Sequence, residues 1–170
     1  GDVYKRQMHK LQEQYLFLAR HNIHSAEELV GTIASLTDKK KETSAEKSRI
    51  YKARERSREL FTAADEMENL KPAEQSYRLG DTFFEDEHRK WVALEQELQA
   101  QGYSLEEVQA LRRHYKEEYS EVCAKEKVVF RELNTGKAIL NSMIPDSISD
   151  GRKTEYNREI IRDRKEQPVR

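Results

Sequence analysis

The chain has 170 residues, which suits one domain or one elongated module. Charged residues make up 37% of it and hydrophobic residues 36%, so little apolar surface is left for a broad core. No apolar run approaches the roughly 18 residues that a membrane-spanning helix needs, and no signal-peptide pattern opens the chain. The single cysteine, Cys123, excludes an internal disulfide and fits a reducing compartment.

Charge is unevenly distributed along the sequence, although the net charge is only −1. Residues 39–58 hold nine Lys or Arg and three Glu, a net charge of +6. Residues 59–107 hold thirteen Asp or Glu and four Lys or Arg, a net charge of −9. The net charge of the whole chain therefore points to no particular kind of partner. Residues 39–58, which we call the basic segment, are a candidate binding surface.

The first seven residues, GDVYKRQ, fit no helical pattern. Asp2 to Gln7 can be encoded by GAT GTG TAT AAG AGA CAG, which looks like the transposon-end adapter used to prepare sequencing libraries. We call residues 1–7 the adapter-like segment and exclude it from fold reasoning. The natural gene is then expected to extend upstream of Met8, and this chain to be a C-terminal fragment of a longer protein.

Helical spacing begins after that segment. Leu11, Tyr15 and Leu18 share one helical face, which predicts a first helix over residues 8–21. Ser25 is a good N-cap, and Glu28 three residues later completes a capping box. The sequence therefore predicts that a second helix begins at about residue 26.

The second predicted helix is long, running over residues 26–70, where Gly31 is the only glycine and proline is absent. A helix of about 45 residues is about 67 Å long and needs a partner helix. Its heptad-like seam is apolar at its ends and polar in its middle. The polar middle includes these positions: Lys40, Thr43, Lys47 and Arg54.

Two shorter helices are predicted next. Pro72 can open a helix over residues 72–79 that Gly80 ends, because proline favours the first helical position and glycine the position after the last. Asp81 or Thr82 then caps a helix over residues 82–101, which Gly102 closes.

The last predicted helix spans residues 105–142, with Ser104 as its cap and Glu107 completing a second capping box. It is the natural partner of the 26–70 helix. The predicted fold is therefore all-α: a helical module over 8–143 built on a long antiparallel, coiled-coil-like hairpin, with short helices capping one end and a mostly disordered tail over 144–170. Leu29, Ile33 and Leu36 should contact Leu133, Leu140 and Met143.

Residues that could carry chemistry have simpler explanations. Glu85 and His88 have the spacing of a di-metal carboxylate bundle, but such a site needs a second pair, and only His114 with Glu117 or Glu118 is available, in reversed order. An exposed charged face is therefore favoured. Cys123 is explained as a small side chain that fills space in the core, and Tyr115 and Tyr119 are explained as packing residues. No nucleophile lies beside a base, so no catalytic residue, metal site or cofactor is expected.

The basic segment is the strongest polar feature, because a cationic helix can follow DNA phosphates. A solvated coiled-coil face is the competing explanation, since Glu42, Glu46 and Glu55 dilute the charge. The candidate DNA-binding residues are the nine cations of the segment: Lys39, Lys40, Lys41, Lys47, Arg49, Lys52, Arg54, Arg56 and Arg58.

Three segments in order resemble the C-terminal helical region of relaxases, the mobilisation nucleases of conjugative elements in Clostridia-type bacteria. The family's approach to a long helix is similar to the segment LQEQYLFLARHNIHSAEEL of this chain. Its middle segment is similar to GDTFFEDEHRKWVALEQE, and its closing helix is similar to LRRHYKEEYSEVCAKEKVVFRELN. In that family a nucleophilic Tyr and a His-rich metal site lie upstream, in an N-terminal domain. No catalytic residue of this chain matches them.

The resemblance implies a non-catalytic region of a bacterial, cytoplasmic mobilisation protein. Such a region would contact DNA or auxiliary mobilisation and transfer proteins, with no membrane partner. A structural coiled-coil protein that self-associates and never meets DNA is the alternative, and the polar middle of the 26–70 seam weighs against it because it weakens a homodimer zipper.

Overall fold

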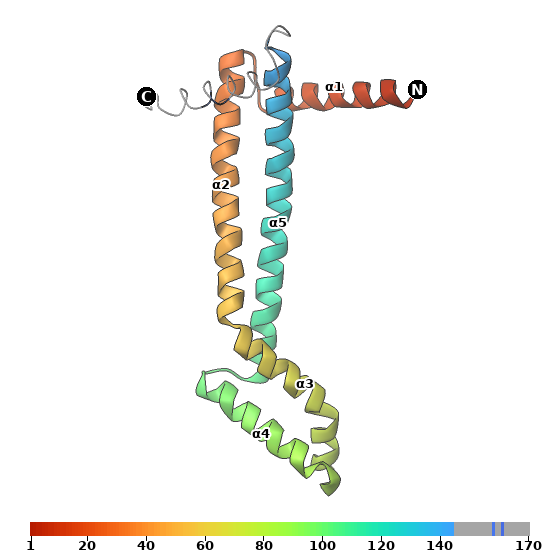
Figure 1. The fold of residues 1–170 in the computed structure, drawn as a ribbon, viewed down its shortest axis with the longest axis vertical. Coiled ribbons are helices and arrows are strands. Elements are labelled where there is room, and N and C mark those ends of the chain that lie inside the picture. The colour runs from red at the N-terminus through yellow and green to blue at the C-terminus, as the bar shows by residue number, and fades with distance from the viewer. Residues whose placement is uncertain (145–157, 159–160, 162–170) are drawn as a thin grey trace. The chain divides into compact units, whose positions relative to one another are not determined.

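The computed structural model describes residues 1–144 together with Arg158 and Ile161. They form five α-helices, α1 (Asp2–Arg20), α2 (Ala26–Arg56), α3 (Arg58–Arg78), α4 (Glu85–Ala100) and α5 (Leu105–Ser142), and one 3-10 helix, η1 (Thr82–Phe84) (Figure 1). These described residues contain no strand, so the predicted all-α class is confirmed. Apart from Ile144, Arg158 and Ile161, the predicted disordered tail lies outside the described residues.

Both predicted capping boxes begin their helices where expected. The Ser25 Oγ accepts a hydrogen bond from the backbone N–H of Glu28 at 3.1 Å, and the Ser104 Oγ accepts one from Glu107 at 3.1 Å. The Glu28 carboxylate in turn accepts from the backbone N–H of His24 at 2.8 Å. These contacts satisfy N–H groups that a helix start leaves without partners, which fixes the first residues of α2 and α5.

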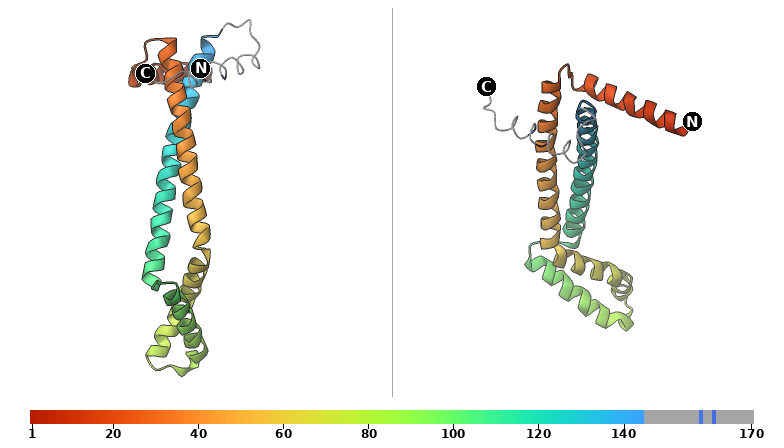
Figure 2. Two further views of the ribbon diagram at one scale, coloured as in Figure 1. Left: turned by 90° about the vertical axis from the view of Figure 1, so that its left-hand side faces the viewer. Right: turned by 45° about the horizontal axis from the view of Figure 1, so that its top comes forward.

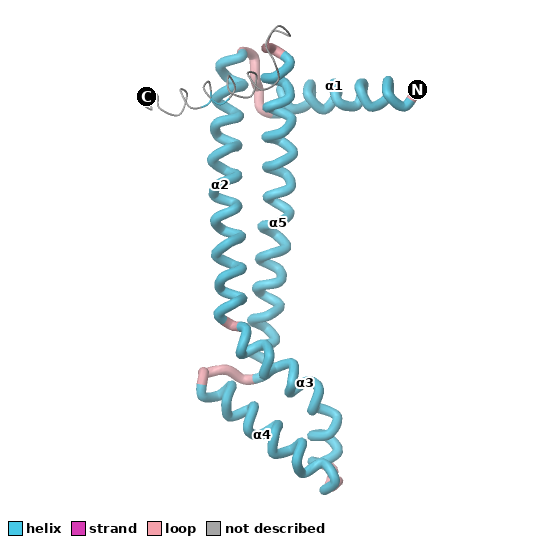
Figure 3. The backbone as a smooth tube through the Cα atoms, in the orientation of Figure 1, coloured by secondary structure: helices cyan, strands magenta, loops and turns pink. Residues whose placement is uncertain are grey.

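The predicted 26–70 helix is wrong in one respect, because it is interrupted at Ser57, where α2 ends and α3 begins (Figure 3). Ser57 is 9% exposed, and its Oγ donates to the carbonyl of Ala53 at 3.1 Å. Serine that bonds back to the carbonyl four residues earlier competes with the regular helical pattern and bends helices. Residues on either side remain helical, so the interruption is confined to one residue.

A second correction concerns Pro72, which does not open a helix over 72–79. It lies inside α3, which continues to Arg78. Pro72 is exposed, so the Glu68 carbonyl that loses its partner can be hydrated. Buried residues of α3 on either side of Pro72, Met67 and Glu74, hold the helix in one piece.

The segment predicted as a helix over 82–101 divides into η1 and α4. The Asp81 carboxylate accepts from the backbone N–H of Phe83 at 3.1 Å, which closes the tight first turn. Gly80 and Gly102 follow α3 and α4 with φ of +102° and +87°. Glycine reaches this left-handed region without steric cost, so both act as the predicted helix stops.

Contacts divide the chain into two compact units, Gly1–Ala45 with Cys123–Arg170, and Glu46–Val122. The apolar core of the first unit joins the end of α1, the first part of α2 and the last part of α5, which lie side by side in Figures 1 and 2. Its buried residues are Phe17, Ile23, Leu29, Val30, Ile33, Leu36, Leu133, Ile139 and Leu140.

Five of the six residues predicted to contact one another across this unit are buried in one cluster. Leu29, Ile33 and Leu36 share the cluster with Leu133 and Leu140. Met143, however, is 53% exposed, and Ile144 is the buried residue at the end of α5 instead. The complete hairpin stays a prediction, and we expect its two long helices to cross at about +20°.

Gly136 marks the closest approach in the first unit. A Cβ placed there would lie 3.1 Å from both Ile33 Cγ1 and Phe17 Cζ, tighter than ordinary packing. A larger residue at 136 would therefore push α1 or α2 outward. Phe17 is fully buried, whereas Leu11 and Tyr15, predicted to share a packing face with Leu18, are 60% and 71% exposed.

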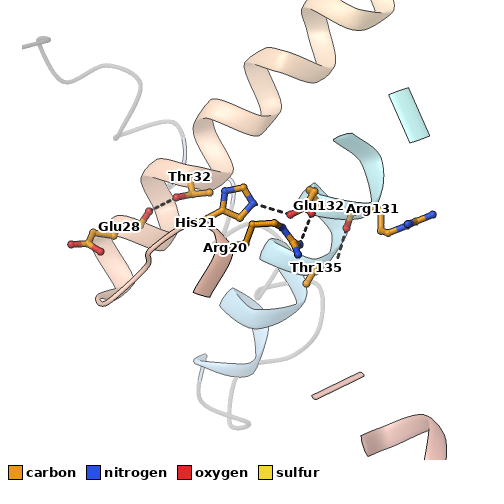
Figure 4. A network of polar contacts seen from close by, with 7 residues as sticks. All are labelled: Arg20, His21, Glu28, Thr32, Arg131, Glu132 and Thr135. Carbon is orange, nitrogen blue, oxygen red and sulfur yellow. Dashed lines mark hydrogen bonds and ion pairs between the residues drawn. The ribbon is translucent and has the colours of Figure 1, made fainter. Parts of the chain in front are cut away.

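Polar contacts also hold α1 to α5 (Figure 4). The Arg20 guanidinium donates to one oxygen of the Glu132 carboxylate at 2.5 Å, and the Nε2 of His21 lies 2.8 Å from the other. The His21 ring also lies against the Phe17 ring, with 4.5 Å between centroids. The end of α1 is thus fixed by one buried ring and one carboxylate with two partners.

The second unit has its own core between α3, α4 and the start of α5. Its buried residues are Leu60, Ala63, Ala64, Met67, Trp91, Leu98 and Val108. Arg112 of α5 donates to both oxygens of the Asp65 carboxylate, at 2.7 and 3.0 Å, and its guanidinium lies 5.0 Å from the centroid of the Phe61 ring. The hydrogen bond from Arg112 lowers the pKa of Asp65, and the same bond raises the pKa of Arg112.

Phe17 is expected to dominate the stability of the first unit. Phe17→Ala should lower the free energy of unfolding by roughly 3 kcal/mol or more, because it removes a fully buried ring and leaves a cavity. Denaturant unfolding followed by circular dichroism measures the change. Leu16→Ala is the matched control, since Leu16 is 49% exposed in the same helical turn and should cost about 0.5 kcal/mol or less. Equal losses in the two variants would contradict this account.

The adapter-like segment forms the first turns of α1, although the first helix was predicted to begin at residue 8. All seven residues are exposed. We therefore expect that deleting residues 1–7 leaves the melting temperature unchanged within error. A drop of several degrees in calorimetry would mean that these residues contribute to the core.

The Asp65–Arg112 pair should make the second unit sensitive to acid. Because folding lowers the pKa of Asp65, the pair stabilises the fold above the ordinary value of 3.8 and loses its effect as the pH falls through the lower, folded value. Asp65→Asn should cost at most about 1 kcal/mol at neutral pH, as befits an exposed pair. Unfolding curves of both proteins should converge once the pH is low enough to protonate Asp65 in the folded state, and a difference that stays constant as the pH falls would exclude this origin.

Candidate nucleic-acid interface

The nine cations predicted as DNA contacts lie on the second half of α2 and at the first residue of α3. They do not form one surface. Three of them, Lys40, Lys47 and Arg54, recur every seven residues, which keeps them on the same side of the helix. Lys40 and Lys47 are partly buried, whereas Arg54 and the other six are exposed: Lys39, Lys41, Arg49, Lys52, Arg56 and Arg58.

The cations spaced by seven residues lie over aromatic rings of α5. The Lys40 Nζ is 4.8 Å from the centroid of Phe130. In the second unit, the Lys47 Nζ and the Arg54 guanidinium carbon lie 5.8 Å and 5.4 Å from the centroid of Tyr119. A cation over an aromatic face is stabilised by the ring's negative potential. These three residues therefore serve packing, and the polar middle of the predicted seam has a structural explanation.

Three of the exposed cations form a coherent surface in the second unit. Arg49, Lys52 and Arg56 are separated by three and four residues, so they project from one side of α2, and we call them the α2 basic face. They span eight residues, from 49 to 56, or roughly 10 Å along the helix axis. Each strand of a DNA duplex carries about three phosphates over that distance. Two of the three are arginines, whose planar guanidinium can donate two hydrogen bonds to one phosphate.

The remaining predicted cations are more scattered. Lys39 and Lys41 lie in the first unit, on opposite flanks of α2 because they are two residues apart. Arg58 begins α3, after the interruption at Ser57. The predicted set thus separates into three packing residues, three residues on a shared face and three isolated ones.

The possible metal pair does not form. Glu85 pairs with Arg89 at 3.1 Å, whereas the Nδ1 of His88 lies 2.7 Å from the Glu74 carboxylate and its ring stacks on Tyr77 with 4.1 Å between centroids. Arg78 donates to the other oxygen of Glu74 at 2.9 Å. No three His, Cys, Asp or Glu side chains gather into a metal-binding group anywhere in the described part of the chain.

Sequence reasoning missed the Glu74 cluster, in which Glu74 is only 2% exposed. Its partners are Arg78, from the next helical turn, and His88 of α4, fourteen residues away. Neither partner stands at a spacing that marks a site. The cluster compensates a buried carboxylate and fastens α4 to α3, as a buried charge requires.

The other residues weighed for chemistry are used in packing or are partly covered. Tyr115 lies edge-on to Phe61, with 6.4 Å between ring centroids, and Tyr119 receives two cations. Cys123 is a half-buried free thiol. Of the helices that the structure describes, none combines the length and the apolar character needed to cross a membrane.

The α2 basic face is therefore the surface on the described residues that best fits the predicted nucleic-acid contact. Comparison of the chain with protein-family models, with curated proteins and with solved structures finds no match.

Proposed function

We propose that this chain is a non-catalytic helical module of a relaxase-like mobilisation protein, and that it contacts DNA phosphates through the α2 basic face. The observation that carries the proposal is the division of the α2 cations. Lys40, Lys47 and Arg54 lie over aromatic rings, while Arg49, Lys52 and Arg56 share one exposed side. The three segments that resemble relaxases supply the protein class.

The chemistry of this surface limits the kind of binding. Arginine and lysine on a regular helix neutralise phosphates, which carry no sequence information. The face has no aromatic side chain among its three residues on which a base could stack. Binding through it should therefore be weak, indifferent to sequence and strongly dependent on salt. The nicking chemistry of the proposed parent protein would lie outside this chain, and the module would extend its hold on DNA or on auxiliary transfer proteins.

The test compares two variants that each remove three cations from α2. In the face variant, Arg49, Lys52 and Arg56 become Gln; in the packing variant, Lys40, Lys47 and Arg54 become Gln. Glutamine is a comparable helix former, so circular dichroism should show intact helices in both. Labelled duplex DNA is titrated with each protein at several salt concentrations.

Each phosphate contact adds about 0.9 to the slope of log K against log salt, so the face variant should lose roughly 2 to 3 units of slope. The packing variant should keep nearly the wild-type slope, because its cations already lie over rings. If both variants lost the same amount of slope, the loss would reflect the removal of three positive charges and not their position on the α2 basic face. Absence of binding even at low salt would overturn the DNA proposal and favour the alternative of a structural coiled-coil protein that does not contact DNA.

A further inference from the structure

Helix α5 carries as many cations as anions, yet four of its cations stand apart from the acids. The helix holds seven Lys or Arg and seven Glu. Residues three or four positions apart are neighbours on a helix surface, where opposite charges pair. Lys116, Lys127 and Arg131 have no Asp or Glu at any of these positions, and Arg113 has one, Glu117. Three of these four cations therefore have no neighbouring acid on their own helix.

Each compact unit holds two of these cations on one side of α5, beside a neutral polar residue. Steps of three and four residues separate the members, which keeps each set on one side of the helix. We call the two sets the α5 triplets: Arg113, Lys116 and Ser120 in the second unit, and Lys127, Arg131 and Asn134 in the first. All six side chains are exposed, and none forms a hydrogen bond or ion pair with another described residue.

The α5 triplets offer positive charge and hydrogen-bond donors, with no acidic and no large apolar side chain. Figure 4 shows Arg131 pointing away from Glu132, the acid next to it in the chain. A helix face that meets only water usually carries both signs of charge, as Glu85 and Arg89 do on α4. Phosphate oxygens accept hydrogen bonds from Lys, Arg, Ser and Asn alike. A lipid surface would also require apolar side chains, which the triplets lack.

We propose that the α5 triplets bind DNA phosphates and form a contact surface separate from the α2 basic face. The same kind of triplet occurs twice, and DNA presents the same anionic group repeatedly, at every nucleotide. An acidic protein segment would have to supply carboxylates at matching positions. The inference rests on the proposed function, because it takes DNA as the partner of this chain.

The second unit shows why the two surfaces are separate. Lys47 and Arg54 lie over the Tyr119 ring, so they mark the side of α2 that faces α5. Each residue of the α2 basic face lies two positions from one of these two cations, which turns it to the opposite side of α2. The α2 basic face therefore points away from α5, and any contact through the triplets is an additional one.

The test uses full-length chains in which four cations become Gln. The α5 variant changes Arg113, Lys116, Lys127 and Arg131. The control variant changes four exposed lysines that each have an acid three or four residues away on the same helix: Lys10, Lys71, Lys90 and Lys125. Both variants lose four positive charges, and circular dichroism should show intact helices in both, because glutamine is a comparable helix former. Labelled duplex DNA is titrated with each variant, and with the face variant, at several salt concentrations.

The α5 variant should lose roughly 3 to 4 units from the slope of log K against log salt, at about 0.9 for each phosphate contact, and the control variant less than about 1. A wild-type slope in the α5 variant, or equal losses in the α5 and control variants, would overturn this inference without touching the α2 basic face. A loss in the α5 variant alone, with a wild-type slope in the face variant, would support the inference and contradict the proposed role of the α2 basic face. Absence of DNA binding, with binding of polyglutamate that the α5 variant loses, would assign the triplets to an acidic protein and overturn the inference.

Discussion

The structure depends on a shortage of apolar side chains. A protein with 37% charged residues cannot line two long helices with leucine and valine throughout, and the seam of α2 is polar over its middle. Here cations take the place of aliphatic residues, and the rings of Phe130 and Tyr119 receive them. Aromatic faces accept the charge while the lysine and arginine stems cover apolar surface, so the seam stays packed without a continuous hydrophobic stripe.

Local signals predicted the helix ends well because their chemistry is complete within a few residues. Ser25, Ser104 and Gly102 act at the ends where capping and left-handed backbone require them. Ser57 and Pro72 were misread because tertiary packing decides between alternatives that are locally similar. A serine within a charged stretch carries no sign that its hydroxyl bonds backward, and an exposed proline can be tolerated inside a helix that is packed on both sides of it.

The candidate nucleic-acid interface was predicted as a stretch of sequence, residues 39–58. In the structure, three of its cations, Arg49, Lys52 and Arg56, share one exposed side of α2. The information that separates its cations was already present in the sequence, since Lys40, Lys47 and Arg54 occupy seam positions and Arg49, Lys52 and Arg56 do not. What the sequence could not supply was an acceptor for the seam cations. That acceptor lies about 65 to 90 residues further along the chain on α5, and helix spacing carries no information on such pairs.

The existence of two separate apolar clusters has a consequence for cooperativity. The clusters share no residue, and each lies within one compact unit. Each unit therefore has a core of its own, and we expect heating or denaturant to melt the two in distinct steps. Trp91, the single tryptophan, belongs to the second cluster. Its fluorescence follows that step alone, whereas the backbone ellipticity of the helices follows both.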